Sequence, residues 1–179
     1  MRPDYEGMLE RAGCSPKVIG HCRAVREAAL AYASRSSSAD PRLVEAGAML
    51  HDIGRGSTHS IRHAQEGADL LRSEGMGEDV ARIVECHTGA GLTADECVLL
   101  GLFARDCVPA TTEEKIVCHA DNLIAGKRQV IIEESIASAI HLPRKARARM
   151  YRLSLEVGLL CHEKRAPAKN LVHKPARQG

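Results

Sequence analysis

Histidine is unusually frequent in this chain and is the first residue type to examine for chemistry. The 179 residues include nine histidines and seven cysteines, but only three tyrosines, one phenylalanine and no tryptophan. The helical period of about 3.6 residues places five polar residues on otherwise apolar helix faces: His21, His51, His63, His87 and Asp121. A buried imidazole without a partner costs about 1–3 kcal/mol, and a buried carboxylate costs more. We therefore expect these side chains to satisfy one another or to share a ligand.

Asp52 extends this set because it follows His51 directly, where the helical period is ending. Two consecutive residues at a helix end can both turn toward one point. The six side chains then offer nitrogen and oxygen donors and no thiolate. Imidazole with carboxylate suits Fe, Mn, Co, Ni or Zn, and the donor types alone do not choose among these metals. The set indicates a site for one or two divalent transition metals.

The order of these residues along the chain carries more information than any single motif. The ordered motifs are His21, then His51-Asp52-Ile53-Gly54, then His63-Ala64 with Gly67-Ala68, then His87-Thr88, then Ala120-Asp121-Asn122. This order resembles the HD-domain metal-dependent phosphohydrolases, in which HDIG is a common signature. The resemblance covers about residues 15–126. The extra histidines at positions 63 and 87 are similar to the branch that binds two metals and cuts phosphate esters or anhydrides, including bacterial diadenosine tetraphosphate hydrolases.

The resemblance implies a role for each member of the set. It implies that one metal is held by His21, His51, Asp52 and Asp121. The second metal would be held by His63 and His87, with Asp52 bridging both ions and with Asp52 and His51 as the catalytic residues. The implied enzyme is a metal-dependent phosphohydrolase that attacks a nucleotide, a dinucleotide or a similar small phosphorylated substrate through a hydroxide bridging the metals.

Four further residues are candidates for substrate binding: Arg55, His59, Arg62 and Lys115. In the family, a basic residue after HDIG commonly faces substrate phosphate, and the guanidinium fork of arginine suits that task. The alternative for Arg55, Arg62 and Lys115 is an ordinary solvated side chain. His59 stands four residues before His63, so both could face one direction on a helix; a substrate contact and a ligand role for His59 both stay open.

The elements that must position these residues are predicted to be helices throughout. The expected helices run over about 16–33, from 41 until Gly54, and over about 59–73, 78–87, 93–102, 112–125, 130–140 and 143–162. Ser15-Pro16 and Asp40-Pro41 are helix starts with proline at the first helical position. Thr93 to Glu96 and Thr111 to Glu114 are capping-box patterns. No segment alternates long enough to predict a strand, so the fold class is all-α: a compact HD-domain bundle of about seven to nine helices.

Composition limits the remaining possibilities. We expect one HD domain over 1–162 and a basic, loosely ordered tail over 163–179. With 25 basic and 23 acidic residues, the chain is too balanced to coat nucleic acid, and its few aromatic residues make base stacking weak. Nucleic acid is therefore not expected as a partner, whereas a small phosphorylated substrate is, and an oligomer is compatible with the sequence. No apolar run reaches the roughly 18 residues of a membrane span, and no signal peptide is evident, which predicts a cytoplasmic protein without a membrane partner.

Two alternatives keep the fold and change the function. The first is a di-iron oxygenase, because a minority of HD-domain proteins activate oxygen at a similar centre. The second is a non-catalytic binding module, in which the metal holds the helices together. Its basic C-terminal region would then dock a partner. The seven cysteines contain no CxxC pair, and we expect them to be reduced and mostly buried.

Overall fold

The computed structural model describes residues 3–161 of the chain. Within this range the chain forms nine α-helices, one 3₁₀ helix (η1) and one short hairpin. Their bounds are α1 (Tyr5–Arg11), α2 (Pro16–Ala33), α3 (Pro41–Leu50), η1 (Ile53–Gly56), α4 (His63–Ser73), α5 (Glu78–Cys86), α6 (Ala94–Leu99), α7 (Thr112–Asn122), β1 (Ile124–Ala125), β2 (Arg128–Gln129), α8 (Ile132–Ser138) and α9 (Arg144–Leu160). The predicted all-α class and the predicted number of helices are confirmed. The predicted tail over 163–179 lies outside the described residues.

Local capping explains where the main helices begin. The side chain of Ser15 accepts a hydrogen bond from the backbone of Val18, and α2 starts at the proline between them. Both predicted capping boxes are formed, at the starts of α6 and α7. In α7 the hydroxyl of Thr111 accepts from the backbone of Glu114, whose carboxylate accepts in return from the backbone of Thr111. These reciprocal bonds satisfy N–H groups that a helix start otherwise leaves unpaired.

Several predicted boundaries differ from the structure. Helix α3 ends at Leu50 rather than at Gly54, and α8 is two residues shorter at each end than predicted. Helix α4 begins at His63 rather than at His59, α6 ends at Leu99, and α7 ends at Asn122. After α7 the chain makes a hairpin in which Ile124 pairs with Gln129, with a turn at Gly126 whose φ is 68°. The prediction that the chain has no strand was therefore wrong at this point. Strands of two residues are too short to produce an alternating pattern, so periodicity could not reveal them.

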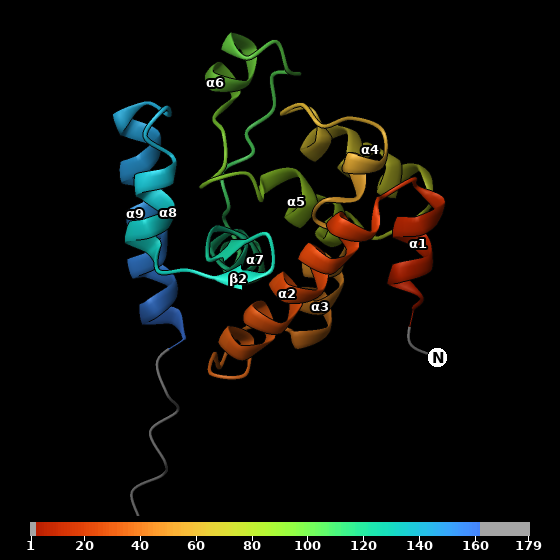
Figure 1. Ribbon diagram of the computed structural model, residues 1–179, viewed down its shortest axis with the longest axis horizontal. Helices are drawn as coiled ribbons and strands as arrows, with labels where there is room; N and C mark the ends of the chain where they lie inside the picture. The colour runs from red at the N-terminus through yellow and green to blue at the C-terminus, as the bar shows by residue number, and fades with distance from the viewer. Residues whose placement is uncertain (1–2, 162–179) are drawn as a thin grey trace, which may run out of the picture.

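Helix α7 is the centre of the bundle. Figure 1 shows it nearly end-on, with α2 and α3 on one side and α8 and α9 on the other. It contacts α2, α3, α5 and α9. The buried side chains form two main apolar clusters, one around α2, α7 and α9 and the other around α1, η1 and α4. Helices α3 and α5 contribute to both, so their C-terminal ends are held firmly from two sides.

The cysteines behave as the sequence analysis expected. All seven cysteines are free and buried, which confirms that they pack as small apolar side chains. Burial raises the pKa of the Cys14 thiol to about 11. Among the described residues, no helix has both the length and the apolar character that crossing a bilayer requires.

Candidate metal centre

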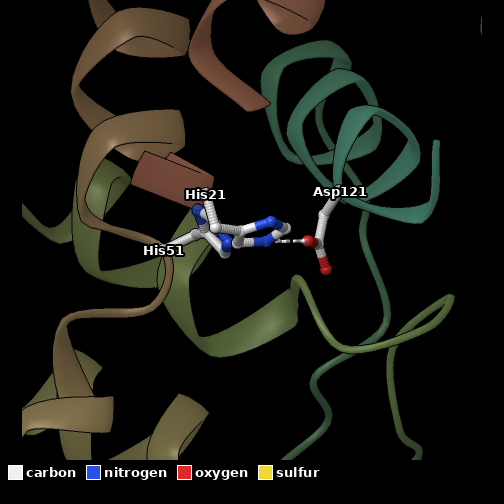
Figure 2. A group of neighbouring side chains, drawn as sticks. All are labelled: His21, His51 and Asp121. Carbon is white, nitrogen blue, oxygen red and sulfur yellow. Dashed lines mark hydrogen bonds and ion pairs between the residues drawn. The ribbon is translucent and has the colours of Figure 1, made fainter. Parts of the chain in front are cut away.

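The six residues of the predicted ligand set come together at one point in the structure. They are carried by different elements: His21 in the middle of α2, His51 and Asp52 at the end of α3, His63 at the start of α4, His87 at the end of α5 and Asp121 in the last turn of α7. Figure 2 shows the imidazoles of His21 and His51 pointing toward the carboxylate of Asp121, which reaches in from α7. Elements distant in sequence thus place their polar side chains around one small volume.

The first half of this metal cluster is built around Asp121. Its Oδ1 lies 2.9 Å from Nε2 of His21 and 3.5 Å from Nε2 of His51. Nε2 of His51 also lies 3.8 Å from Oδ2 of Asp52. One ligand atom from each of His21, His51 and Asp121 falls within 4.8 Å of the others, a spacing that a single ion can span.

The second half is built around the other oxygen of Asp52. Oδ1 of Asp52 lies 3.2 Å from Nε2 of His63 and 3.6 Å from Nε2 of His87. The two Nε2 atoms of His63 and His87 are themselves 3.1 Å apart. Asp52 therefore presents one oxygen to each half. This is the position that a carboxylate bridging two ions would occupy.

All four imidazoles are oriented in the same way, by a bond from Nδ1 to a backbone carbonyl. The Nδ1 distances are 2.9 Å from His21 to Gly126 O, 2.8 Å from His51 to Ala48 O, 2.8 Å from His63 to Ser60 O and 2.6 Å from His87 to Val84 O. With Nδ1 held by a carbonyl, Nε2 faces the cluster, where it can donate a proton to a carboxylate in the absence of metal or offer its lone pair to a metal. This arrangement is typical of metal-ligating histidines, whose second nitrogen is fixed by a neighbouring acceptor.

Burial and charge make the cluster costly without a cation. Burial opposes ionisation of Asp52, but the neighbouring imidazoles of His51, His63 and His87 outweigh it and hold the pKa of Asp52 well below its usual range. The same balance, with His21 and His51, holds the pKa of Asp121 far below normal. Nε2 of His51, whose side chain is 0% exposed, has no hydrogen-bond partner among the described residues. A divalent metal fits this donor set, because it would satisfy that nitrogen and both carboxylates together.

The glycine of the HDIG motif has a steric reason. A Cβ atom added to Gly54 would lie 2.8 Å from the backbone nitrogen of Gly67 and closer still to the carbonyl oxygen of His63. A Cβ on Gly67 would in turn lie 3.0 Å from the nitrogen of Gly54. The 3₁₀ turn therefore packs backbone to backbone against the first turn of α4. This contact brings His63 next to Asp52.

A cavity of about 560 Å³ opens beside the cluster and is lined in part by His21 and Asp52. Arg55 lines it too, donating from Nε to Oδ1 of Asp52 at 3.1 Å and from Nη1 to the carbonyl of His59 at 2.9 Å. His59 is exposed at the cavity wall, and its imidazole is not part of the cluster. The structure thus brings the candidates Arg55 and His59 to the mouth of the site.

Two other candidates for substrate binding lie elsewhere. Arg62 donates to the carbonyl of Gly101 at 2.9 Å, in the loop after α6. Lys115 forms an ion pair with Glu156 of α9. The structure does not bring either side chain to the metal cluster, and both have structural partners that account for them.

The cavity also contains residues that sequence reasoning missed. Lys17, Gly126 and Lys127 all line it. No local sequence pattern indicated them. Lys17 lies at the start of a predicted helix, where an exposed lysine is ordinary, and Gly126 and Lys127 follow the end of another predicted helix. The unexpected hairpin places the carbonyl of Gly126 next to His21 of α2.

Comparison with known proteins agrees with this geometry. A sequence model of the HD domain matches residues 18–126, which is more than half of the chain. The chain therefore belongs to the HD-domain family, and the resemblance seen in the sequence is confirmed. A solved structure, the HD domain of the phosphodiesterase PgpH of L. monocytogenes, superposes with a TM-score of 0.54 at 16% identity, covering 89% of this chain and 99% of that one. At this identity the likeness shows the fold alone.

Curated relatives carry several different names. An uncharacterised protein of Methanocaldococcus jannaschii is 48% identical over 127 residues, covering 69% of this chain and 75% of that protein. A tRNA (cytidine(56)-2'-O)-methyltransferase of Thermoplasma volcanium is 46% identical over 137 residues, covering 75% of this chain. This chain spans only 40% of the length of that methyltransferase. A ribonuclease Y of Acidothermus cellulolyticus is 33% identical over 103 residues, covering 56% of this chain and 18% of that protein.

Proposed function

We propose that this protein is a metal-dependent phosphohydrolase that cleaves a phosphate ester or anhydride of a nucleotide, dinucleotide or similar small phosphorylated molecule. The observation that carries the proposal is the convergence of four inward Nε2 atoms and two carboxylates on one small volume, in which Nε2 of His51 has no hydrogen-bond partner among the described residues. Membership of the HD-domain family supports it. In this proposal His21, His51, Asp52 and Asp121 hold one metal.

His63 and His87 would hold a second metal, with Asp52 shared between the two ions. A bound metal of this kind acts as a Lewis acid on a phosphoryl oxygen and lowers the pKa of water. Asp52 and His51 are the catalytic residues of the proposal because they occupy the centre of the cluster. Their side chains are held in place by the Nδ1 bond of His51 and the Arg55 bond to Asp52, so little reorganisation is needed when substrate binds.

The protein supplies a binding face as well as a metal site. Arg55 lines the cavity, and its Nε is bonded to Asp52. Its remaining N–H groups and the exposed imidazole of His59 can donate to phosphate oxygens. Among residues 3–161, the aromatic rings that line this cavity are imidazoles, and no phenyl or phenol ring joins them. We therefore expect the substrate to be recognised through its phosphate and the metals rather than through base stacking.

A second candidate is cleavage of a phosphodiester in RNA. It is supported by relatives named ribonuclease Y. The relative named a tRNA methyltransferase shares only the connection to RNA, since its name describes methyl transfer and not cleavage. Both candidates use the same metal chemistry and differ in the size of the substrate. Short RNA oligonucleotides belong beside nucleotides in any substrate screen, and product analysis would separate the two candidates.

The test is to load the full chain separately with Mn, Fe, Co, Ni and Zn, measure bound metal, and screen nucleotides, dinucleotides and short RNA for phosphate release or chain cleavage. His51→Gln should lower both metal content and activity. His141→Gln is the matched control, because His141 is exposed and lies outside the cluster. A folded, metal-loaded protein that is inactive on every phosphate compound would contradict the proposal.

The alternative functions give different results in the same experiment. Oxygen consumption by the iron-loaded protein, without phosphate release, would identify a di-iron oxygenase. Loss of the fold on metal removal, with no hydrolysis of any substrate, would favour a binding module held together by metal. The His141→Gln control separates either result from a general loss of stability.

A further inference from the structure

The cavity beside the metal cluster contains two cationic side chains that the proposed metal site does not use. They are Lys17, in the first turn of α2, and Lys127, in the turn between β1 and β2. Arg55 in the same cavity is paired with Asp52. Neither lysine takes part in any ion pair or side-chain hydrogen bond within residues 3–161. Two uncompensated ammonium groups therefore face the same space as His21 and Asp52.

The hairpin turn ties Lys127 directly to the metal cluster. The carbonyl of Gly126 accepts the bond from Nδ1 of His21, and Lys127 is the next residue. The side chain of Lys127 then runs over Gly20, the neighbour of His21 in α2. A Cβ atom on Gly20 would lie 2.9 Å from Nζ of Lys127 and closer still to its Cε. Glycine is unfavourable in the middle of a helix, and here its missing side chain leaves the room that the lysine occupies.

The charge of this cavity exceeds what one phosphate group requires. The metals and Arg55 would match the phosphate that is cleaved. Lys17 and Lys127 add two further positive charges to the lining of the cavity. Lysine binds phosphate as a point charge without demanding one geometry. These groups suit a second anionic group beside the first.

A neighbouring cavity offers no comparable charge. It measures about 330 Å³ and starts at Thr88 and Gly89, directly after His87. Its lining is mostly apolar, and its one arginine, Arg149, is paired with Glu96. The anionic part of a substrate would therefore lie on the side of Lys17 and Lys127.

Building on the proposed phosphohydrolase function, we infer that Lys17 and Lys127 bind a second phosphate of the substrate, adjacent to the phosphate that is cleaved. The substrate class is then one with two neighbouring phosphate groups. The second group can belong to an anhydride, as in a nucleoside diphosphate, or to the next phosphodiester of a 5'-phosphorylated dinucleotide. Both sources present the same anionic oxygens to the lysines.

The experiment compares two probes on the manganese-loaded full chain, inorganic phosphate and imidodiphosphate, a pyrophosphate analogue that resists hydrolysis. Equilibrium binding should favour imidodiphosphate by about tenfold in the wild type. Lys127→Gln should weaken imidodiphosphate about fivefold and phosphate less than twofold, as expected for a partly exposed ion pair. Arg128→Gln is the matched control, because Arg128 lies in the same hairpin and pairs with Glu134 outside the cavity.

Gly20→Ala provides a second variant that keeps every charge. The added methyl group displaces the ammonium of Lys127 and, as alanine favours helix, should not unfold α2. It should lower the preference for imidodiphosphate in the same direction as Lys127→Gln. Metal content is measured for each variant, so that loss of metal is not mistaken for loss of the second phosphate.

The results separate this inference from the proposed function. If Lys127→Gln weakens both probes equally, or no more than Arg128→Gln does, the second-phosphate site is wrong even when the protein hydrolyses phosphate esters. If the lysine-dependent preference is present but no phosphate compound is hydrolysed, the site stands and the hydrolase proposal fails. Competition by a nucleoside diphosphate and by a 5'-phosphorylated dinucleotide identifies the source, and failure of both to compete overturns the inference.

Discussion

Two polar clusters meet at the C-terminal end of α5, one through His87 and the other through Glu85, and they differ in whether the protein supplies a partner for every buried polar group. The first is the metal cluster. The second surrounds Glu85, whose side chain is 2% exposed. Its carboxylate accepts from Arg105 at 2.8 Å, from Arg82 at 3.0 Å and from Arg72 at 3.2 Å. Asp69 pairs with Arg72 and Arg105, Glu78 pairs with Arg72, and Glu114 lies 3.9 Å from Arg82, so each guanidinium group in the Glu85 network has at least two carboxylate partners.

The metal cluster has the opposite character. Its carboxylates are ionised and its imidazoles are fixed, yet Nε2 of His51 has no hydrogen-bond partner among the described residues. Nε2 of His63 and Nε2 of His87 lie 3.1 Å apart and both face the same oxygen of Asp52, so one carboxylate oxygen is shared by two imidazoles. A buried polar group without a partner is expensive. A buried charged group whose partners are all present, such as Glu85, therefore indicates a structural role. Several buried polar groups that converge without enough partners indicate a site for a ligand.

The largest expected effect comes from removing the carboxylate shared by both halves of the metal cluster. Asp52→Ala should lower hydrolysis by at least about 10³-fold and reduce bound metal, because catalysis and both metal positions depend on this side chain. Asp79→Ala, on the exposed start of α5, is the control and should retain both properties. Normal metal content in Asp52→Ala would show that Asp52 is not a ligand.

The Glu85 network should respond in stability rather than in activity. Glu85→Ala leaves three guanidinium groups without their shared buried carboxylate, and we expect it to lower the free energy of unfolding by about 3–5 kcal/mol. Glu78→Ala removes an exposed partner of Arg72 and should cost about 1 kcal/mol or less. Urea denaturation of both variants measures this. Equal effects would mean that burial does not distinguish Glu85 from Glu78.

Removing the metal should affect one cluster and spare the other. Metal present at about 100 times its dissociation constant stabilises a folded protein by about 3 kcal/mol. A chelator should therefore lower the melting temperature of the wild type by about 6–12 °C. The Glu85→Gln variant should show the same chelator-dependent shift, and Asp52→Ala should show little. A similar shift in all three proteins would indicate that the metal binds elsewhere.

Much of the candidate site was predictable because it depends on local periodicity. The spacing of His21, His51, His63, His87 and Asp121 on apolar helix faces already indicated that they point inward, and the structure places them together. Helix starts were predictable for a similar reason, since caps are set by residues three or four apart. Their roles as metal ligands stay a prediction.

Long-range partners could not be predicted in this way. Arg62 and Lys115 were candidates for the substrate, with a solvated side chain as the alternative, but Gly101 O and Glu156 hold them, and those groups lie 39 and 41 residues away in sequence. His119 is buried, and its Nε2 lies 3.3 Å from the hydroxyl of Tyr32, a partner 87 residues away. Burial lowers the pKa of His119 to about 4. Such outcomes depend on how helices pack, which no single segment encodes.

The boundary of α4 illustrates a conflict between local signals. Periodicity allowed the helix to begin at His59, but it begins at His63, whose Nδ1 donates to the carbonyl of Ser60. The same carbonyl also accepts from the backbone N–H of His63, so residues 60–63 form a turn rather than a longer helix. The tight packing of Gly54 against this turn favours the observed start. The bond that orients His63 and the packing of Gly54 against α4 therefore both favour a helix that begins at His63 over a longer one.

The smallest expected effect is the dependence on pH. The metal cluster should lose its metal, and the Glu85 network its contribution to stability, in different pH ranges. Imidazole ligands exchange metal for protons as the pH falls below about 6.5, so bound metal should be lost first. Burial opposes ionisation of Glu85, but its bonds to Arg72 and Arg105 outweigh it and lower the pKa of Glu85. The Glu85 network is therefore fully stabilising above the ordinary glutamate pKa of about 4.3, and it weakens only as the pH falls through the lower folded value.

Denaturation at a series of pH values tests this order. The difference in unfolding free energy between the metal-free wild type and Glu85→Gln should be constant above about pH 5 and should narrow below about pH 4. The metal content of the wild type is measured after dialysis at the same pH values, and it should already have fallen near pH 6. If metal loss and the narrowing occurred at one pH, the two clusters would not be independent, and the contrast between a completed network and an unsatisfied ligand site would fail.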